Sequence, residues 1–185
     1  DTSVSNRDFA WARIDVPGPK DLWVISVHLL TSGSGVRNTE ATQLKGLIQA
    51  NIAAGDNLAI GGNTKTDSRS EACITTLSTV VVTASPYPAD KNANSNTNAA
   101  RAKPYDWLVA DTDLNQYKTS VIIASSTLSN ALVFDSRVYT PLAEVAPVLL
   151  NDSGATNMQH MATVKDFLIP TGGGATPTAT PTPSP

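Results

Sequence analysis

The sequence predicts an α/β domain, and three consecutive stretches carry this prediction. Residues 22–30 (LWVISVHLL) are almost continuously apolar, as in a strand that is buried on both faces. Residues 39–54 place apolar side chains at helical spacing, and Gly55 ends that pattern. Residues 57–60 form a second short apolar run. A strand, a helix and a strand at this spacing predict a crossover unit within a parallel sheet.

Shorter patterns predict the remaining elements. Residues 8–16 alternate and are expected to form a strand with one aliphatic face, paired with residues 22–30. Residues 85–102 are rich in Asn, Ala and Pro and have no periodicity, which predicts a long surface loop of functional or mobile character. A short helix is expected at 71–77, and further strands at 79–83, 105–110, 121–124, 132–134 and 161–169.

The chain is expected to divide into one domain and a tail. Its 185 residues, 41% of them apolar, suit a single domain with its own core, which we assign to residues 1–170. Residues 171–185 (TGGGATPTATPTPSP) are of low complexity. They predict a linker or tail that is extended in the polyproline sense.

Composition restricts the classes of partner. The 13 basic and 16 acidic residues give a formal net charge of −3, so any contact with nucleic acid is expected to be local or metal-assisted. No apolar run approaches the roughly 20 residues that span a bilayer. The single cysteine, Cys73, excludes an internal disulfide and is expected to be a small buried residue, with a reactive thiol as the alternative. A chain that begins at Asp1 rather than Met is expected to be processed, and we predict an extracellular or secreted protein.

The second apolar run ends at two glycines, and polar side chains crowd the turn that follows, in residues 61–69 (GGNTKTDSR). Glycine lets a backbone come close to a ligand, and strand ends aim side chains at it. With its surroundings, the stretch resembles the endonuclease/exonuclease/phosphatase superfamily, the deoxyribonuclease-I-like metal-dependent phosphodiesterases. The family pattern at this place reads G-D-F-N-T. Asn63 and Lys65 stand where the family has Asp and Asn.

Three further positions match motifs of the same family. His28 ends an apolar strand where the family has a phosphate-contacting histidine. Asp106, in KPYDWL, matches the family strand whose Asp binds phosphate or stabilises the transition state. His160, in MQHMAT, matches S-D-H-x-P, in which an Asp-His pair activates the attacking water. Gln159 replaces that Asp, and an uncharged amide would leave His160 a weaker base.

The resemblance implies a site and a cofactor. The implied catalytic residues are His28, Asp106 and His160, with Mg²⁺ or a similar divalent cation; a lone histidine in an apolar strand can instead be a satisfied core residue. Asn63 would be a weak metal ligand, because an amide supplies no charge. Two cations of the same loop, Lys65 and Arg69, either hold a phosphate or are solvated loop residues.

The resemblance also implies a fold, partners and a function. It predicts a two-sheet β-sandwich flanked by helices and incomplete on its N-terminal side, since nothing before His28 matches the family's Asn and metal-binding Glu. A second polypeptide that supplies the missing half is one expectation, and self-assembly is another. The implied function is a divergent hydrolase of phosphodiesters or nucleic acid. The alternative is a non-catalytic extracellular module with a structural, filament-forming or adhesive role.

Overall fold

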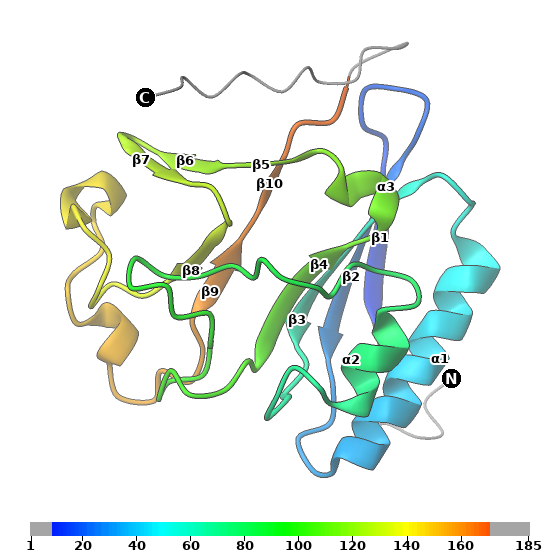
Figure 1. The fold of residues 1–185 in the computed structure, drawn as a ribbon, viewed down its shortest axis with the longest axis horizontal. Coiled ribbons are helices and arrows are strands. Elements are labelled where there is room, and N and C mark those ends of the chain that lie inside the picture. Colours follow the sequence, from blue (N-terminus) through cyan, green and yellow to red (C-terminus); the bar gives the residue numbers. More distant parts are fainter. Residues whose placement is uncertain (1–8, 171–185) are drawn as a thin grey trace.

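Residues 9–170 of the computed structural model are described here, and they combine a helix-covered sheet with an irregular half beside it (Figure 1). The sheet has the strand order β1-β2-β3-β4. Two helices pack against each other on one of its faces, α1 (Ser34–Asn51) and α2 (Ala72–Leu77). The strands are β1 (Ala10–Ile14), β2 (Leu22–His28), β3 (Asn57–Asn63) and β4 (Asp106–Ala110).

The predicted crossover unit is confirmed. Strands β2 and β3 are parallel neighbours, in register from Leu22 opposite Asn57 to His28 opposite Asn63, and α1 connects them. The other two neighbours of the sheet pair antiparallel, β1 with β2 and β3 with β4. The carboxyl ends of β2 and β3 therefore meet at one edge of the sheet, next to the start of β4.

Helix α1 begins at Ser34, five residues before the predicted start. Its first turns bury two charged residues rather than apolar ones, so hydrophobic periodicity does not mark them. The Arg37 guanidinium lies 2.8 Å from the Glu71 carboxylate, and Glu40 accepts a hydrogen bond of 2.8 Å from the Leu30 N–H. These contacts connect the helix to the two segments that follow β2 and β3.

The main core lies between the sheet and the helices. Alternate residues of β2, β3 and β4 enter it, including Ile25, Ile60 and Trp107. Cys73 of α2 is fully buried there, as predicted, and burial raises the pKa of its thiol to about 11. The thiol therefore stays protonated at neutral pH and is a poor nucleophile.

The opposite face of the sheet is open over β1 and β2. The prediction that β2 is buried on both faces is wrong, because Val24, Ser26 and His28 are exposed. The aliphatic face predicted for the first strand lies on this side too, and its Ile14 is 43% exposed. Over β3 and β4 a small cluster covers the face, with Leu114 fully buried within it. The sheet thus has one completed layer and one that is half covered.

The irregular half contains short two-stranded ladders rather than a second large sheet. Of the strands expected there, residues 132–134 coincide with β8, whereas residues 161–169 form two short strands. Residues 79–83 are not a strand, although the Val82 N–H donates to the Ala110 carbonyl. The elements are α3 (Thr112–Asn115), β5 (Lys118–Thr119), β6 (Val121–Ile123), β7 (Ser126–Leu128), β8 (Leu132–Phe134), β9 (Ala162–Val164), β10 (Asp166–Phe167) and the 3-10 turns Leu142–Val145 and Asp152–Gly154.

These ladders pair β5 with β10, β6 with β7 and β8 with β9. Within residues 9–170 the architecture is therefore mixed α and β with one sheet of more than two strands, and the predicted two-sheet sandwich is not seen in this part of the chain. The predicted tail, 171–185, lies outside the described residues. No helix between residues 9 and 170 is long and apolar enough to cross a membrane.

Strand β3 continues through the two glycines that were expected to end it. It runs to Asn63, paired on both sides. Gly62 makes this possible, because its φ is 137° and a Cβ there would lie 2.1 Å from the Val27 carbonyl oxygen. A residue without a side chain lets β2 and β3 stay adjacent up to the edge that carries the polar residues.

We predict opposite effects for two Gly→Ala substitutions. Gly62→Ala should lower the free energy of unfolding by at least about 3 kcal/mol, because the methyl group meets backbone at a positive φ. Gly46→Ala, in an open position of α1, should raise it by roughly 0.5–1 kcal/mol. Urea denaturation of both variants measures the difference. Equal stabilities would contradict the role assigned to Gly62.

Candidate active site

Three side chains predicted for the site form one row across the sheet. His28 of β2 is paired with Asn63 of β3, and Asn63 is paired with Asp106 of β4. Side chains alternate along a strand, and the neighbours Val27 and Trp107 enter the core under the helices. His28, Asn63 and Asp106 therefore point to the open face, at the carboxyl ends of the parallel strands.

His160 joins this row through Asp106. Its Nδ1 lies 2.9 Å from Asp106 Oδ2. A carboxylate can only accept, so Nδ1 donates, and the neutral imidazole has its acceptor lone pair on Nε2. The expectation that His160 lacks a charged partner, because Gln159 replaces the family's Asp, is wrong: a carboxylate 54 residues away in sequence faces the ring.

Asn63 is held by both of its polar atoms. Its Oδ1 accepts a hydrogen bond of 2.8 Å from the Lys65 N–H, and its Nδ2 lies 3.3 Å from Nε2 of His28. His28 is exposed on the open face, so the alternative of a core histidine does not hold. The Asn63 amide thus links His28 to the turn at Lys65. Its N–H group, rather than its oxygen, faces His28.

The two cations predicted to hold phosphate lie in different places. Lys65 Nζ lies 3.9 Å from the centre of the Tyr105 ring, and that ring is 6.0 Å from the His160 ring. Lys65 is therefore near the row. Arg69 instead stacks on Tyr87 at 4.3 Å and donates to the Ser95 carbonyl, so its guanidinium fastens another loop.

A residue that the sequence did not single out, Thr97, brings the parts of the site together. Its Oγ1 accepts a 2.7 Å hydrogen bond from the Asp106 N–H, and its carbonyl accepts one of 2.7 Å from the Met161 N–H. Asn98, the next residue, forms a β-bridge with His160. Thr97 is 1% exposed. Nothing in its sequence neighbourhood, a run of Asn, Ser and Ala, marks it as a structural residue.

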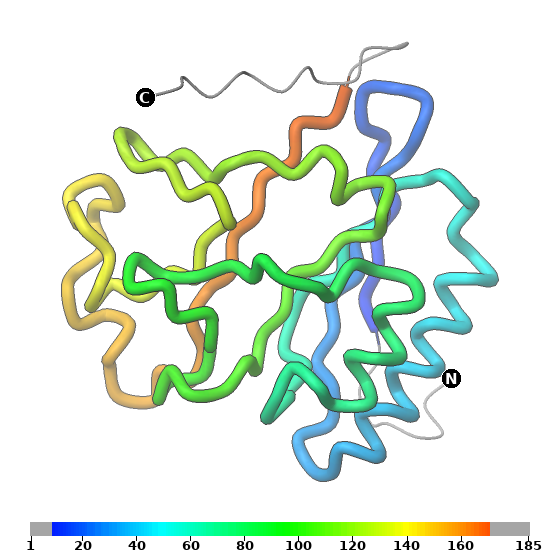
Figure 2. Tube along the Cα trace, viewed as in Figure 1, coloured from blue at the N-terminus to red at the C-terminus, as the bar shows by residue number. Residues whose placement is uncertain are grey.

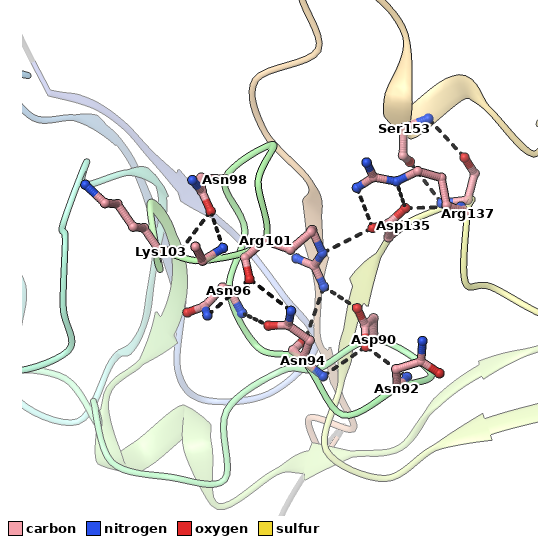
Figure 3. Close-up of polar contacts among 12 residues, drawn as sticks. Asp90, Asn92, Asn94, Asn96, Asn98, Arg101, Lys103, Asp135, Arg137 and Ser153 are labelled. Atoms are coloured by element: carbon pink, nitrogen blue, oxygen red, sulfur yellow. Dashed lines mark hydrogen bonds and ion pairs between the residues drawn. The ribbon is translucent and has the colours of Figure 1, made fainter.

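The segment around Thr97 is a long loop without a helix or a strand, as expected, and buried polar contacts at Asp90 and Thr97 fix it to the rest of the molecule. It crosses from α2 to β8 and returns to the start of β4, as the green trace in Figure 2 shows. Asp90 Oδ1 accepts hydrogen bonds from the N–H groups of Asn92 and Asn94, and Asn94 donates to the Arg101 carbonyl (Figure 3). The asparagines thus replace the missing strand or helix hydrogen bonds.

Buried charges close this segment. Arg101 forms ion pairs with Asp90 and, at 3.1 Å, with Asp135, and Asp135 also pairs with Arg137 (Figure 3). Burial pushes the pKa of Asp135 up, but hydrogen bonds from Arg137 and the charge of Arg101 outweigh it and hold that pKa below its ordinary value. The Asp135 carboxylate therefore stays ionised in the interior, and Arg101 links the loop to the end of β8.

A hollow of about 410 Å³ adjoins the Asp106–His160 pair on the open face. Its wall combines the two polar side chains with glycines of β3 and with apolar residues. Gly61, Gly62, Leu108, Met161 and Ala162 contribute to it. A ligand in this hollow would reach the imidazole and rest against small, mainly apolar groups.

The described residues do not fit a divalent cation by themselves. Hard cations need several oxygen ligands, and carboxylates above all. Asp106 Oδ2 already contacts His160, and Asn63 Oδ1 already accepts from Lys65 N–H. Between residues 9 and 170 no group of three His, Cys, Asp or Glu side chains is placed to hold a metal.

Comparisons with known proteins show a shared fold and do not show a function for this chain. No family model matches the chain, and no curated protein matches it. A functionally unknown conserved protein from Enterococcus faecalis V583 aligns with a TM-score of 0.54 and 9% identity, over 86% of this chain and 56% of that one. This similarity shows a shared fold.

Two further solved structures from bacteria also match. Beta toxin from Staphylococcus aureus gives a TM-score of 0.47 at 15% identity, and sphingomyelinase C from Streptomyces griseocarneus gives 0.44 at 18%. Each match covers 68% of this chain and 54% of the other. The chain spans about half the length of these structures. A further beta toxin structure contains bound magnesium ions.

The buried charges generate a stability prediction. Arg101→Met should lower the free energy of unfolding by about 3–5 kcal/mol at pH 7, since it leaves Asp90 and Asp135 buried without their shared cation. Arg13→Met, a matched change in an exposed pair with Asp21, should cost less than about 1 kcal/mol.

The pH dependence of the same pair of variants provides a second readout. A lowered pKa for Asp135 means that its ionised form contributes stability above about pH 4, and that this contribution is lost as pH falls through the folded-state value. The deficit of Arg101→Met, measured by urea denaturation, should therefore shrink between pH 7 and pH 3. A deficit that grows on acidification would contradict this account.

Proposed function

We propose that the chain is a divergent member of the endonuclease/exonuclease/phosphatase superfamily and that it carries the histidine side of a phosphodiester-hydrolysing site. The observation that carries the proposal is the Asp106–His160 contact on the open face, in line with Asn63 and His28. A histidine oriented by a carboxylate is the arrangement that general-base catalysis requires. The sequence motifs around these residues, which resemble the family's, support the same assignment.

His160 would act as the general base. With Nδ1–H donated to Asp106, Nε2 takes a proton from a water molecule, and the water oxygen attacks phosphorus. The bond from phosphorus to the leaving oxygen then breaks, and the leaving oxygen takes a proton from solvent. Asp106 stabilises the imidazolium that forms, at the contact distance of 2.9 Å.

Other residues of the row would bind the phosphate. Asn63 presents N–H groups to the open face, and Lys65 supplies a cation beside Tyr105 and His160. His28 would contact a phosphate oxygen from the adjacent strand. Donors of this kind, preorganised on strand ends, favour the charge that develops on the phosphoryl oxygens. The substrate class that fits is a phosphodiester, in nucleic acid or in a smaller molecule.

The family resemblance implies Mg²⁺ or a similar cation, and the described residues supply too few oxygen ligands for one. We propose that the missing carboxylates come from a second polypeptide whose β-layer covers the open face. Two observations favour this partner. Ile14 and Val24 expose apolar side chains there, and the site row lies on the same face. We also propose an extracellular location for the assembled protein.

A non-catalytic role is the second candidate. The observation that favours it is the state of Asn63, whose amide is bonded to the Lys65 N–H and to His28 in place of a metal-binding carboxylate. In this role the same fold would serve as a structural, filament-forming or adhesive module. Self-assembly through the open face would then replace the catalytic partner.

We expect any hydrolysis of bis(p-nitrophenyl) phosphate or of DNA, with or without Mg²⁺, to depend on His160. His160→Ala should lower the rate by about 10²–10⁴-fold, since it removes the general base. Asp106→Asn should lower it as well, because an amide can favour the other imidazole tautomer. Ser68→Ala, an exposed change nearby, is the matched control and should be neutral.

The double variant Asn63→Asp with Lys65→Asn separates the two candidates. If the site is a degraded metal site, this variant should acquire a Mg²⁺-dependent rate. Lack of hydrolysis by both the native chain and the double variant, with and without Mg²⁺, would contradict the hydrolase proposal and favour the structural module. Thermal melts of all variants exclude loss of fold as the cause.

The open face gives a separate prediction. The native chain should bind the dye ANS or associate with a second copy, because apolar side chains of β1 and β2 are exposed. Ile14→Ser combined with Val24→Ser should reduce both signals, measured by fluorescence and sedimentation. Leu168→Ser, exposed on another element, is the control. A monomer that binds no dye would argue against a partner on this face.

A further inference from the structure

A second cavity lies along the free edge of β4, and Asp106 lines both this cavity and the hollow beside His160. Residues 82–88 and the neighbourhood of β8 and β9 form its other walls. The volume open to water-sized groups is about 30 Å³, so the cavity is much smaller than the hollow beside His160. Trp107, Leu108 and Thr163 also line both cavities, whereas Arg69, Tyr87 and Lys165 line this one and not the hollow.

Two cations of the lining lack a counter-charge. Among residues 9–170, no carboxylate lies within ion-pair distance of Lys165 or Arg69. Burial, with the nearby charge of Lys118, lowers the pKa of Lys165 to about 8, and burial lowers the pKa of Arg69 as well. Two partly desolvated cations on the walls of one cavity are costly unless an anion compensates them.

Polar atoms with unused hydrogen-bonding capacity belong to the same lining. Arg69 Nε and Thr163 Oγ1 are buried and have no hydrogen-bond partner within the described chain. The remaining Arg69 nitrogens donate to neutral groups, the Ser95 carbonyl and the Asn96 side chain. These donors are therefore held in place by the loop but are not neutralised by it.

The backbone of β4 adds a further donor. The Asp106 N–H donates to Thr97, and the Ala110 carbonyl accepts from Val82 N–H, both on the side away from β3. Alternation along an antiparallel strand turns the N–H and C=O of Leu108 to that same side, and Leu108 lines the cavity. The cavity thus combines two cations, a hydroxyl and a strand edge.

We propose that this cavity binds a small tetrahedral oxyanion of the phosphate class. Such an ion has oxygen acceptors on every side, which match the Lys165 ammonium, Arg69 Nε and the Thr163 hydroxyl. The charge of Asp106 opposes it less than a free carboxylate would, because Asp106 is engaged with His160. The proposal goes beyond the hydrolase function and does not depend on it, since Arg69 and Lys165 are not in the row of His28, Asn63 and Asp106.

Isothermal titration calorimetry with inorganic phosphate tests the site. Sulfate serves as a second tetrahedral anion, and a 5′-mononucleotide tests whether a phosphate on a larger molecule also binds. Lys165→Met and Thr163→Val should each weaken phosphate binding by about tenfold or more, as the loss of a charge-assisted hydrogen bond predicts. Lys91→Met is the matched control, because Lys91 donates to Ser126 away from the cavity, and binding should be unchanged. Mononucleotide binding with the same pattern of losses would show that the cavity accepts a phosphate on a product.

Thermal melts provide a readout that a structural role would not give. Without anion, Lys165→Met should be as stable as the native chain or more so, because a desolvated cation is replaced by an apolar side chain. At saturating phosphate the order should reverse, since only the native chain gains stability from binding. Should Lys165→Met fail to fold, Lys165→Arg, which keeps the charge, and Thr163→Val carry the comparison.

The proposal and the hydrolase function fail separately. His160→Ala should retain phosphate binding, whatever its effect on hydrolysis. The proposal is overturned if neither phosphate nor sulfate binds at about 10 mM, if Lys165→Met and Thr163→Val bind as well as the native chain, or if His160→Ala alone abolishes binding. The last result would place the anion in the site row instead.

Discussion

The candidate site depends on the two hydrogen bonds that meet at Thr97. One fixes the backbone of Asp106 at the start of β4, and the other fixes Met161 directly after His160. Two segments that are distant in sequence are thereby held in place by one buried side chain and its own carbonyl. The 2.9 Å contact between Asp106 and His160 is a consequence of this arrangement, because β4 pairs with β3 and, among the described residues, no strand ladder joins β4 to the segment of His160.

Thr97 can play this part because buried charges hold its loop. Arg101 adopts a positive φ of 56° and still reaches both Asp90 and Asp135, so an unfavourable backbone conformation is offset by ion pairs that are shielded from water. The side chains of the Asn-rich stretch satisfy the backbone that a strand or helix would otherwise satisfy (Figure 3). Ion pairs and side-chain hydrogen bonds to the backbone thus define the conformation of the Asn-rich loop.

The open face connects the fold to the proposed chemistry. Helices cover one side of the sheet over β2, β3 and β4, while His28, Asn63 and Asp106 lie on the other, next to exposed apolar residues of β1 and β2. The row has an oriented imidazole but too few carboxylates for a divalent ion. A partner that covered the open face would therefore also lie next to the site row and could supply the missing carboxylates. The oxyanion cavity at the free edge of β4 does not depend on such a partner.

The sequence by itself determined the crossover of β2, α1 and β3, the short helix α2 and the burial of Cys73, because these follow from apolar periodicity and local propensity. Motif resemblance also selected the four polar residues of the site. Tertiary structure alone decided that α1 starts at a buried ion pair, that buried polar contacts fix the loop of residues 85–102, and that Asp106, not residue 159, faces His160. Buried polar contacts between distant residues leave no periodic signal in the chain, so only the folded arrangement specifies them.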